Sequence, residues 1–200
     1  MANDRPLFSV YFKDKSEGWA VGLWSLMLHT TDGGTTWQEV ALAPPPGSTK
    51  ADINLYSMFS NLKGELFISA EKGLVLRSTD AGKSWNYLPT GYAGSFWSGT
   101  ALKDGTLLVG GLRGSIYRSS DDGQAWSSVS TSFHSSVNSI IQRSNGTVQA
   151  VALDGVSLLS NDGGTTFGGT QRPDRSPLTA VAQAQDGRLA FFSSSGPVKQ

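Results

Sequence analysis

An eight-residue pattern repeats along the chain, and its spacing constrains the fold more than any other feature. The pattern is Ser or Thr, any residue, Asp, any residue, Gly, any two residues and then an aromatic residue. Its aspartates lie 48, 41 and 41 residues apart, at Asp32, Asp80, Asp121 and Asp162. A column of turn glycines keeps an interval of 41 residues, at Gly73, Gly114, Gly155 and Gly196. An interval shared by independent markers indicates a repeat protein.

Each repeat unit reads as a set of short strands. In the third unit, "SFWSGTAL" leads into Asp104-Gly105, a strong hairpin signal, and "TLLVGG", "SIYRSS" and "AWSSVS" follow with turns between them. No unit holds a sustained apolar period of about 3.6 residues, so we expect almost no helix. Four strands in roughly 40–50 residues are typical of a β-propeller blade, and a solenoid is the weaker alternative.

The sequence therefore predicts an all-β fold, a β-propeller of four-stranded antiparallel blades in a single domain over residues 1–200. The five expected units cover approximately residues 7–42, 53–90, 95–131, 136–170 and 177–200.

Composition narrows the classes of function. The formal net charge is zero, so the chain lacks the positive excess that favours nucleic acid. There is no cysteine, and the two histidines, His29 and His134, do not have metal-ligand spacing, so we expect no metal and no cofactor. No apolar run approaches the ~20 residues of a membrane span, and no signal peptide is visible. We expect a soluble protein, cytoplasmic if the chain begins here and periplasmic if a leader precedes it.

We expect the repeated pattern, called the box below, to be structural. It falls in the turn between the third and fourth strands of a unit. An aspartate there can accept hydrogen bonds from backbone N–H groups two or three residues further on. The box glycines suit positive φ, at Gly34, Gly82, Gly123 and Gly164. The box aromatics can fold back over the turn, at Trp37, Trp85, Trp126 and Phe167. Four catalytic aspartates are disfavoured, because catalysis needs different groups at one point.

The boxes "TTDGGTTW", "STDAGKSW", "SSDDGQAW" and "SNDGGTTF" resemble the Asp-box, also called the bacterial neuraminidase repeat. Within that group, "GWAVGLWSLMLHTTDGGTTW" and "GGLRGSIYRSSDDGQAW" are similar to the photosystem II stability and assembly factor family. The resemblance covers about Leu7 to Gly196. It implies a propeller, typically seven-bladed, that acts as a non-enzymatic chaperone. Because this chain has five units, it is either a portion of a longer propeller or a small propeller of its own.

The expected function is therefore a non-catalytic, protein-binding scaffold whose partner is a protein client. The alternative is a carbohydrate-binding or glycoside-hydrolysing propeller, because Asp-box propellers include sialidases. A sialidase needs an arginine triad, a tyrosine nucleophile, a glutamate and an acid/base aspartate. The glutamates all lie in the first two units, at Glu17, Glu39, Glu65 and Glu71, and no Tyr–Glu pairing is evident. We expect no catalytic residues.

Candidate partner-binding residues lie in three places, each with solvated loop or core packing as the alternative reading. The turns between the second and third strands lie at the end of a blade opposite the boxes, and loops carry function. These turns present Trp24, Lys72 and Arg113. The resemblance implies a basic contact surface at Arg77 and Arg118, although Leu159 interrupts that column. The first strands carry an aromatic column of Phe8, Tyr56 and Trp97.

The fifth unit is expected to be incomplete. By the period, Gly196 opens a third strand, and the next box would begin near residue 201. The fifth blade then lacks its box and its fourth strand. Residues 1–6, which precede the first strand, barely suffice for one short strand. An exposed sheet edge is a pairing template, so the chain is expected either to form a homodimer or to show an incomplete ring that lacks blades.

Overall fold

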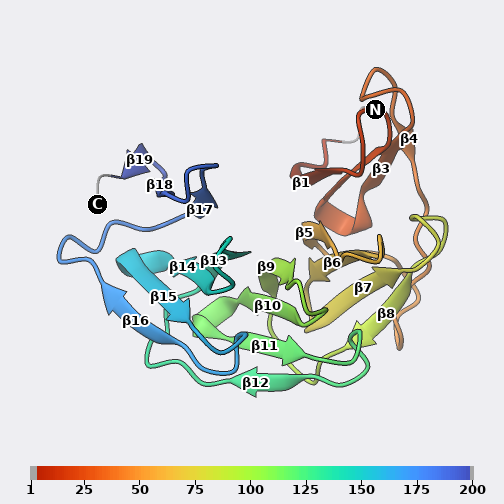
Figure 1. Ribbon diagram of the computed structural model, residues 1–200. Helices are drawn as coiled ribbons and strands as arrows, with labels where there is room; N and C mark the ends of the chain where they lie inside the picture. The colour runs from red at the N-terminus through yellow and green to blue at the C-terminus, as the bar shows by residue number, and fades with distance from the viewer. Residues whose placement is uncertain (1–3, 199–200) are drawn as a thin grey trace. The chain divides into compact units, whose positions relative to one another are not determined.

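A computed structural model describes residues 4–198 (Figure 1). The described residues form five antiparallel sheets, four with four strands and the last with three. The only helical segments in this part of the chain are three single turns of 3-10 helix. The predicted all-β propeller architecture is confirmed. None of the described helices is long and apolar enough to cross a membrane.

The chain divides into two compact units, residues 1–95 and 96–200, which we describe separately. The first unit holds two blades, each a meander in which consecutive strands pair. The first blade consists of β1 (Leu7–Phe12), β2 (Gly18–Gly22), β3 (Met27–Thr30) and β4 (Gln38–Glu39). The second consists of β5 (Leu55–Ser60), β6 (Leu66–Ala70), β7 (Leu74–Ser78) and β8 (Asn86–Pro89).

The second unit holds the third to fifth blades. The third consists of β9 (Phe96–Ala101), β10 (Leu107–Gly111), β11 (Ile116–Ser119) and β12 (Ser127–Val129). The fourth consists of β13 (Val137–Gln142), β14 (Val148–Ala152), β15 (Val156–Ser160) and β16 (Gly168–Gln171). The fifth consists of β17 (Ala180–Gln183), β18 (Leu189–Ser193) and β19 (Gly196–Val198), so its fourth strand is missing from the described residues, as predicted. Residues 1–3 of the segment considered above for strand closure lie outside the described residues.

Each blade has two ends of different character. Because its strands run antiparallel in chain order, the first and third turns share one end and the second turn lies at the other. We call the first the box end, since every box lies there. The other is the link end, where the chain also passes from one blade to the next. At this end η1 (Leu23–Ser25), η2 (Leu112–Gly114) and η3 (Leu153–Gly155) form the second turns of the first, third and fourth blades.

Side chains pack between neighbouring blades within each unit. In the first unit, Trp19, Val21 and Met27 of the first blade are buried in one cluster with Leu55 and Met58 of the second. This arrangement follows from alternation along a strand, because alternate residues of one sheet face the next sheet.

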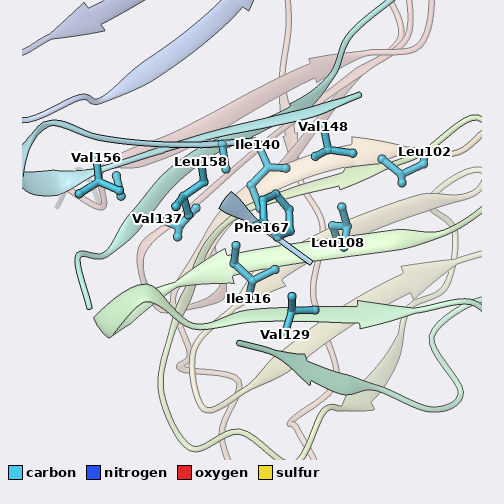
Figure 2. Packing of buried hydrophobic residues seen from close by; sticks show 12 residues of the cluster. Leu102, Leu108, Ile116, Val129, Val137, Ile140, Val148, Val156, Leu158 and Phe167 are labelled. Atoms are coloured by element: carbon cyan, nitrogen blue, oxygen red, sulfur yellow. The ribbon is translucent and has the colours of Figure 1, made fainter. Parts of the chain in front are cut away.

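In the second unit the corresponding cluster joins the third and fourth blades. Figure 2 shows Val137 and Ile140 of β13 with Leu108 and Ile116 of the third blade and with Phe167 of the fourth box. Val137 and Ile140 are 0% and 4% exposed. Burial of such a side chain contributes about 1.5–3 kcal/mol, so this interface supplies much of the unit's stability.

A column of serines links the first strands of adjacent blades. Ser98 Oγ accepts a hydrogen bond from Ile140 N (3.0 Å), and Ser139 Oγ accepts one from Val181 N (3.4 Å). In the first unit, Ser9 Oγ accepts one from Met58 N (3.1 Å). A small hydroxyl therefore satisfies a backbone donor of the next blade where first strands approach closely.

Candidate protein-binding surface

The four boxes adopt one hydrogen-bonded turn. In the second box, Ser78 Oγ accepts from Gly82 N (2.8 Å) and donates to Asp80 Oδ1 (2.8 Å). Asp80 Oδ1 also accepts from Ser84 N, and Asp80 Oδ2 accepts from Ser84 Oγ (2.6 Å). The aspartate thus bonds four residues further on, rather than two or three as expected. The loop between Asp80 and Ser84 contains Gly82 at φ 80°, which lengthens the turn.

The box aromatic closes the same turn. Trp85 Nε1 donates to Gly82 O at 3.2 Å, and Trp37 and Trp126 make the same bond in their own boxes. Phe167, which has no N–H, is instead 7% exposed in the core of the second unit. The aromatic therefore covers the turn either with a polar bond or by burial.

Hydrogen bonds shift the titration of the box carboxylates. The hydroxyl and N–H of Ser84 and the hydroxyl of Ser78 lower the pKa of Asp80 to about 2. Equivalent donors lower the pKa of Asp32 and Asp162 to about 2, and that of Asp121 below its usual value. Donors stabilise the charged form, so these carboxylates are ionised at neutral pH and act as turn acceptors.

The box turn also packs on the preceding blade. A Cβ placed on Gly82 would lie 2.7 Å from Trp19 Nε1 of the first blade. A Cβ placed on Gly164 would lie 2.7 Å from a methyl of Leu108 in the third blade. Both glycines have positive φ. Glycine is therefore required twice over, by the backbone conformation and by the close approach of the neighbouring blade.

Arg77 and Arg118 are engaged in contacts within their own units. Arg77 Nη2 pairs with Glu65 Oε1 at 2.8 Å, and its guanidinium lies 6.0 Å from the ring centre of Phe67. Arg118 Nε donates to Gly163 O at 3.1 Å, the carbonyl of a residue in the next box. His29 occupies the same column and stacks on Trp19 at 4.8 Å. This column supports the boxes, and a client would have to compete with these contacts.

The link-end candidates share an unusual backbone. Trp24, Lys72 and Arg113 have φ of 52°, 57° and 56°, in the left-handed region, and Asp154 has 57°. All four are exposed. A bulky side chain in this region is uncommon, so the turn holds the residue there against its own preference. The side chain is presented to solvent on a fixed backbone.

A polar network in the first unit fixes Trp24. Trp24 N donates to Asn54 Oδ1 at 3.1 Å, and Ser25 N donates to Ile53 O at 2.7 Å. Asn54 is held in turn by Glu71, whose Oε2 accepts from Asn54 N (2.9 Å) and whose Oε1 accepts from Asn54 Nδ2 (2.7 Å). The link into the second blade therefore positions the second turn of the first blade.

The same network reaches an aromatic pair. Tyr56 OH donates to Glu71 Oε1 at 3.3 Å, and the Tyr56 ring stacks on Phe8 with centroids 5.5 Å apart and planes at 16°. Phe8 is 44% exposed and Trp24 is 58% exposed. We call Phe8, Trp24 and Tyr56 the aromatic patch. Asn54 and Glu71 were not among the predicted site residues, because they are 17 residues apart and share no local motif.

The remaining candidates lie in the second unit. Arg113 N donates to Ser136 Oγ at 3.2 Å, which anchors its turn to the link before the fourth blade. Trp97 lies on β9 and is partly exposed. No group of three or more His, Asp or Glu side chains within residues 4–198 is placed to hold a metal ion.

Known proteins resemble this chain in sequence and in fold. Residues 1–197 match the family described as "Photosynthesis system II assembly factor YCF48". The chain is 32% identical over 89 residues to the "Photosystem II assembly lipoprotein Ycf48" of Synechococcus sp. (strain CC9902), which covers 44% of this chain and 25% of that protein.

Two solved structures show the relation in three dimensions. "YCF48 bound to D1 peptide" is 25% identical, with a TM-score of 0.75 over 97% of this chain and 64% of that one. A virginiamycin B lyase from Staphylococcus aureus has a TM-score of 0.80 at 16% identity, over 98% of this chain and 69% of that one, and so shares the fold alone. The chain spans about a quarter of the curated relative's length and about two thirds of these structures. Because the family match extends over nearly the whole sequence, the chain belongs to the YCF48 photosystem II assembly factor family.

Proposed function

We propose that the chain is a non-catalytic assembly-factor propeller that binds a peptide segment of a protein client. The support is its family and its 25% identity to a propeller solved with a D1 peptide. A segment of D1 is therefore the first client to test.

We place the peptide on the aromatic patch. The observation that carries this assignment is Trp24, a 58% exposed indole held at positive φ by Asn54 and Glu71. Tryptophan and tyrosine dominate the energy of protein interfaces, and a rigid ring loses little conformational entropy on binding. The stacked Phe8 and Tyr56 extend the apolar area, while Lys72, exposed on the next second turn, adds a positive charge.

These features favour a peptide with an apolar side chain that lies against the rings and an acidic group near Lys72. Phe8, Tyr56 and Trp24 supply area, and Lys72 attracts the acid from solvent, which affects the association rate more than the affinity. Arg77 and Arg118 contribute less, because each is engaged by its own unit.

A hydrolytic function is less well supported. The box aspartates are exposed acceptors in four separate turns, and each is bonded to its own Ser or Thr hydroxyls or backbone. A glycosidase needs two carboxylates that converge on one bond. The lyase neighbour is only 16% identical, so its activity does not transfer.

Fluorescence anisotropy with a labelled D1 peptide tests the proposal. We expect saturable binding by the wild-type chain, and Trp24→Gly should weaken it more than about tenfold, the scale of an interface hot spot. Phe8→Ala should weaken it less. Leu62→Ala is the matched control, because Leu62 is 81% exposed in the first turn of the second blade, at the box end. Equal affinity for wild type and both patch variants would contradict the placement, and no binding by the wild type would contradict this client.

A further inference from the structure

The first blade carries an apolar face that equivalent positions in other blades bury. Val10 aligns with Met58, Ile140 and Val181, and Leu7 aligns with Leu55, Val137 and Leu178. Val10 and Leu7 are 63% and 48% exposed. The aligned residues are all at most 7% exposed, at Met58, Ile140, Val181, Leu55, Val137 and Leu178. The same position is thus built for burial in one blade after another.

This face of the first blade is hollowed. A groove of about 400 Å³ runs over it, lined chiefly by Leu7, Val10, Ala20, Leu28 and Trp37. None of these side chains is charged. Exposed apolar area of this kind, continuous across four strands, marks an interaction surface.

In the other blades, the residues that cover this position come from the second and third strands of the preceding blade. Trp19, Val21 and Met27 cover the second blade, and Leu108 and Ile116 cover the fourth. The fitting partner is therefore the opposite face of a propeller blade.

The fifth blade offers such a face. Leu189 and Phe191 of β18 pack toward the fourth blade, so Ala190 and Phe192 point the other way. Ala190 is exposed, and its neighbours on that face, Ala182 and Pro197, are exposed as well. In the first, third and fourth blades the residues aligned with Ala190 are Trp19, Leu108 and Gln149, which are 1%, 0% and 5% exposed.

We infer that the first-blade face of one chain docks on the fifth-blade face of a second copy of the same chain. The contact joins two different surfaces, so it is heterologous, head to tail. Both surfaces are apolar and built of the same repeat, and blade-on-blade packing within each unit shows the geometry that this repeat uses.

Sedimentation velocity over a concentration series tests the inference. The wild-type chain should form species of at least twice 21.2 kDa, with a Kd tighter than about 100 µM. Val10→Asp and Ala190→Asp should each raise that Kd more than about tenfold, because each places a charge in an apolar contact. Leu62→Asp, on an 81% exposed turn residue, should leave it unchanged.

Mixing the two variants distinguishes a head-to-tail contact from other arrangements. Val10→Asp retains an intact fifth-blade face and Ala190→Asp an intact first-blade face, so an equimolar mixture should recover a one-to-one complex. Both positions are exposed, and unchanged melting curves will show that the variants are folded. A wild-type chain that stays monomeric at about 100 µM, or a mixture that fails to associate, would overturn the inference.

Discussion

Ser78 Oγ accepts the backbone hydrogen bond of Gly82 at 2.8 Å, and both residues are buried. The same hydroxyl donates to Asp80, whose side chain is exposed. The buried polar atom of the box is therefore the serine oxygen, and the aspartate orients it from the solvent side. This division separates the first two predictions.

Ser78→Ala should destabilise the chain by about 1–3 kcal/mol, because it leaves the buried Gly82 N–H without an acceptor. Denaturant unfolding followed by tryptophan fluorescence measures the change. Thr79→Ala, at the adjacent exposed position, serves as the control and should have little effect. If both variants unfold at the wild-type midpoint, the hydroxyl does not hold the turn.

Asp80→Asn should lower the melting temperature at neutral pH, and the difference from wild type should vanish in acid. The folded pKa of Asp80 is lowered to about 2 from 3.8. A lowered folded pKa contributes stability above the unfolded pKa and loses it as pH falls through the folded one. The difference should therefore be constant above about pH 5 and shrink between about pH 4 and pH 2.

Melting curves of both proteins from neutral pH to acid provide the measurement. A difference in melting temperature that stays constant into acid, or grows there, would show that the carboxylate charge does not support the turn.

Ser98→Ala should cost about 1–3 kcal/mol, because Ile140 N–H loses its acceptor in the next blade. Ser139→Ala should cost less, since its bond to Val181 N is longer, at 3.4 Å. Chemical unfolding of the two variants gives the comparison. The reverse order would mean that these serines are selected for size alone.

Trp24→Gly should leave the free energy of unfolding within about 1 kcal/mol of wild type. Glycine removes the steric cost of φ 52°, which offsets the lost contacts of an indole that is mostly exposed. Thermal unfolding tests this expectation. A large destabilisation would show that Trp24 is a structural residue, and would weaken its assignment as a binding residue.

The sequence predicts the blades well because their turns depend on local chemistry. Box residues such as Asp80 and Gly82 recur at a fixed interval, and Gly196 opens β19 where that interval requires it. The separation of the box end from the link end then follows from antiparallel order alone.

The sequence does not predict the site network. Non-glycine residues at positive φ, such as Trp24, give no local signal. The bonds from Asn54 to Glu71 join residues that meet only after β5 and β6 have paired. The contacts of Arg118 likewise depend on the next box, whose Gly163 carbonyl is 45 residues away in sequence. Such contacts arise from the packing of one blade on another.

The indole N–H resonances of the six tryptophans test the central claim most directly. Three of these groups, in Trp37, Trp85 and Trp126, are bonded to box glycine carbonyls at the end of the blade opposite the aromatic patch. In an NMR titration with the D1 peptide, the Trp24 resonance should move with the peptide concentration, while these three stay in place. Movement of the box resonances with an unchanged Trp24 would contradict the placement of the client on the aromatic patch.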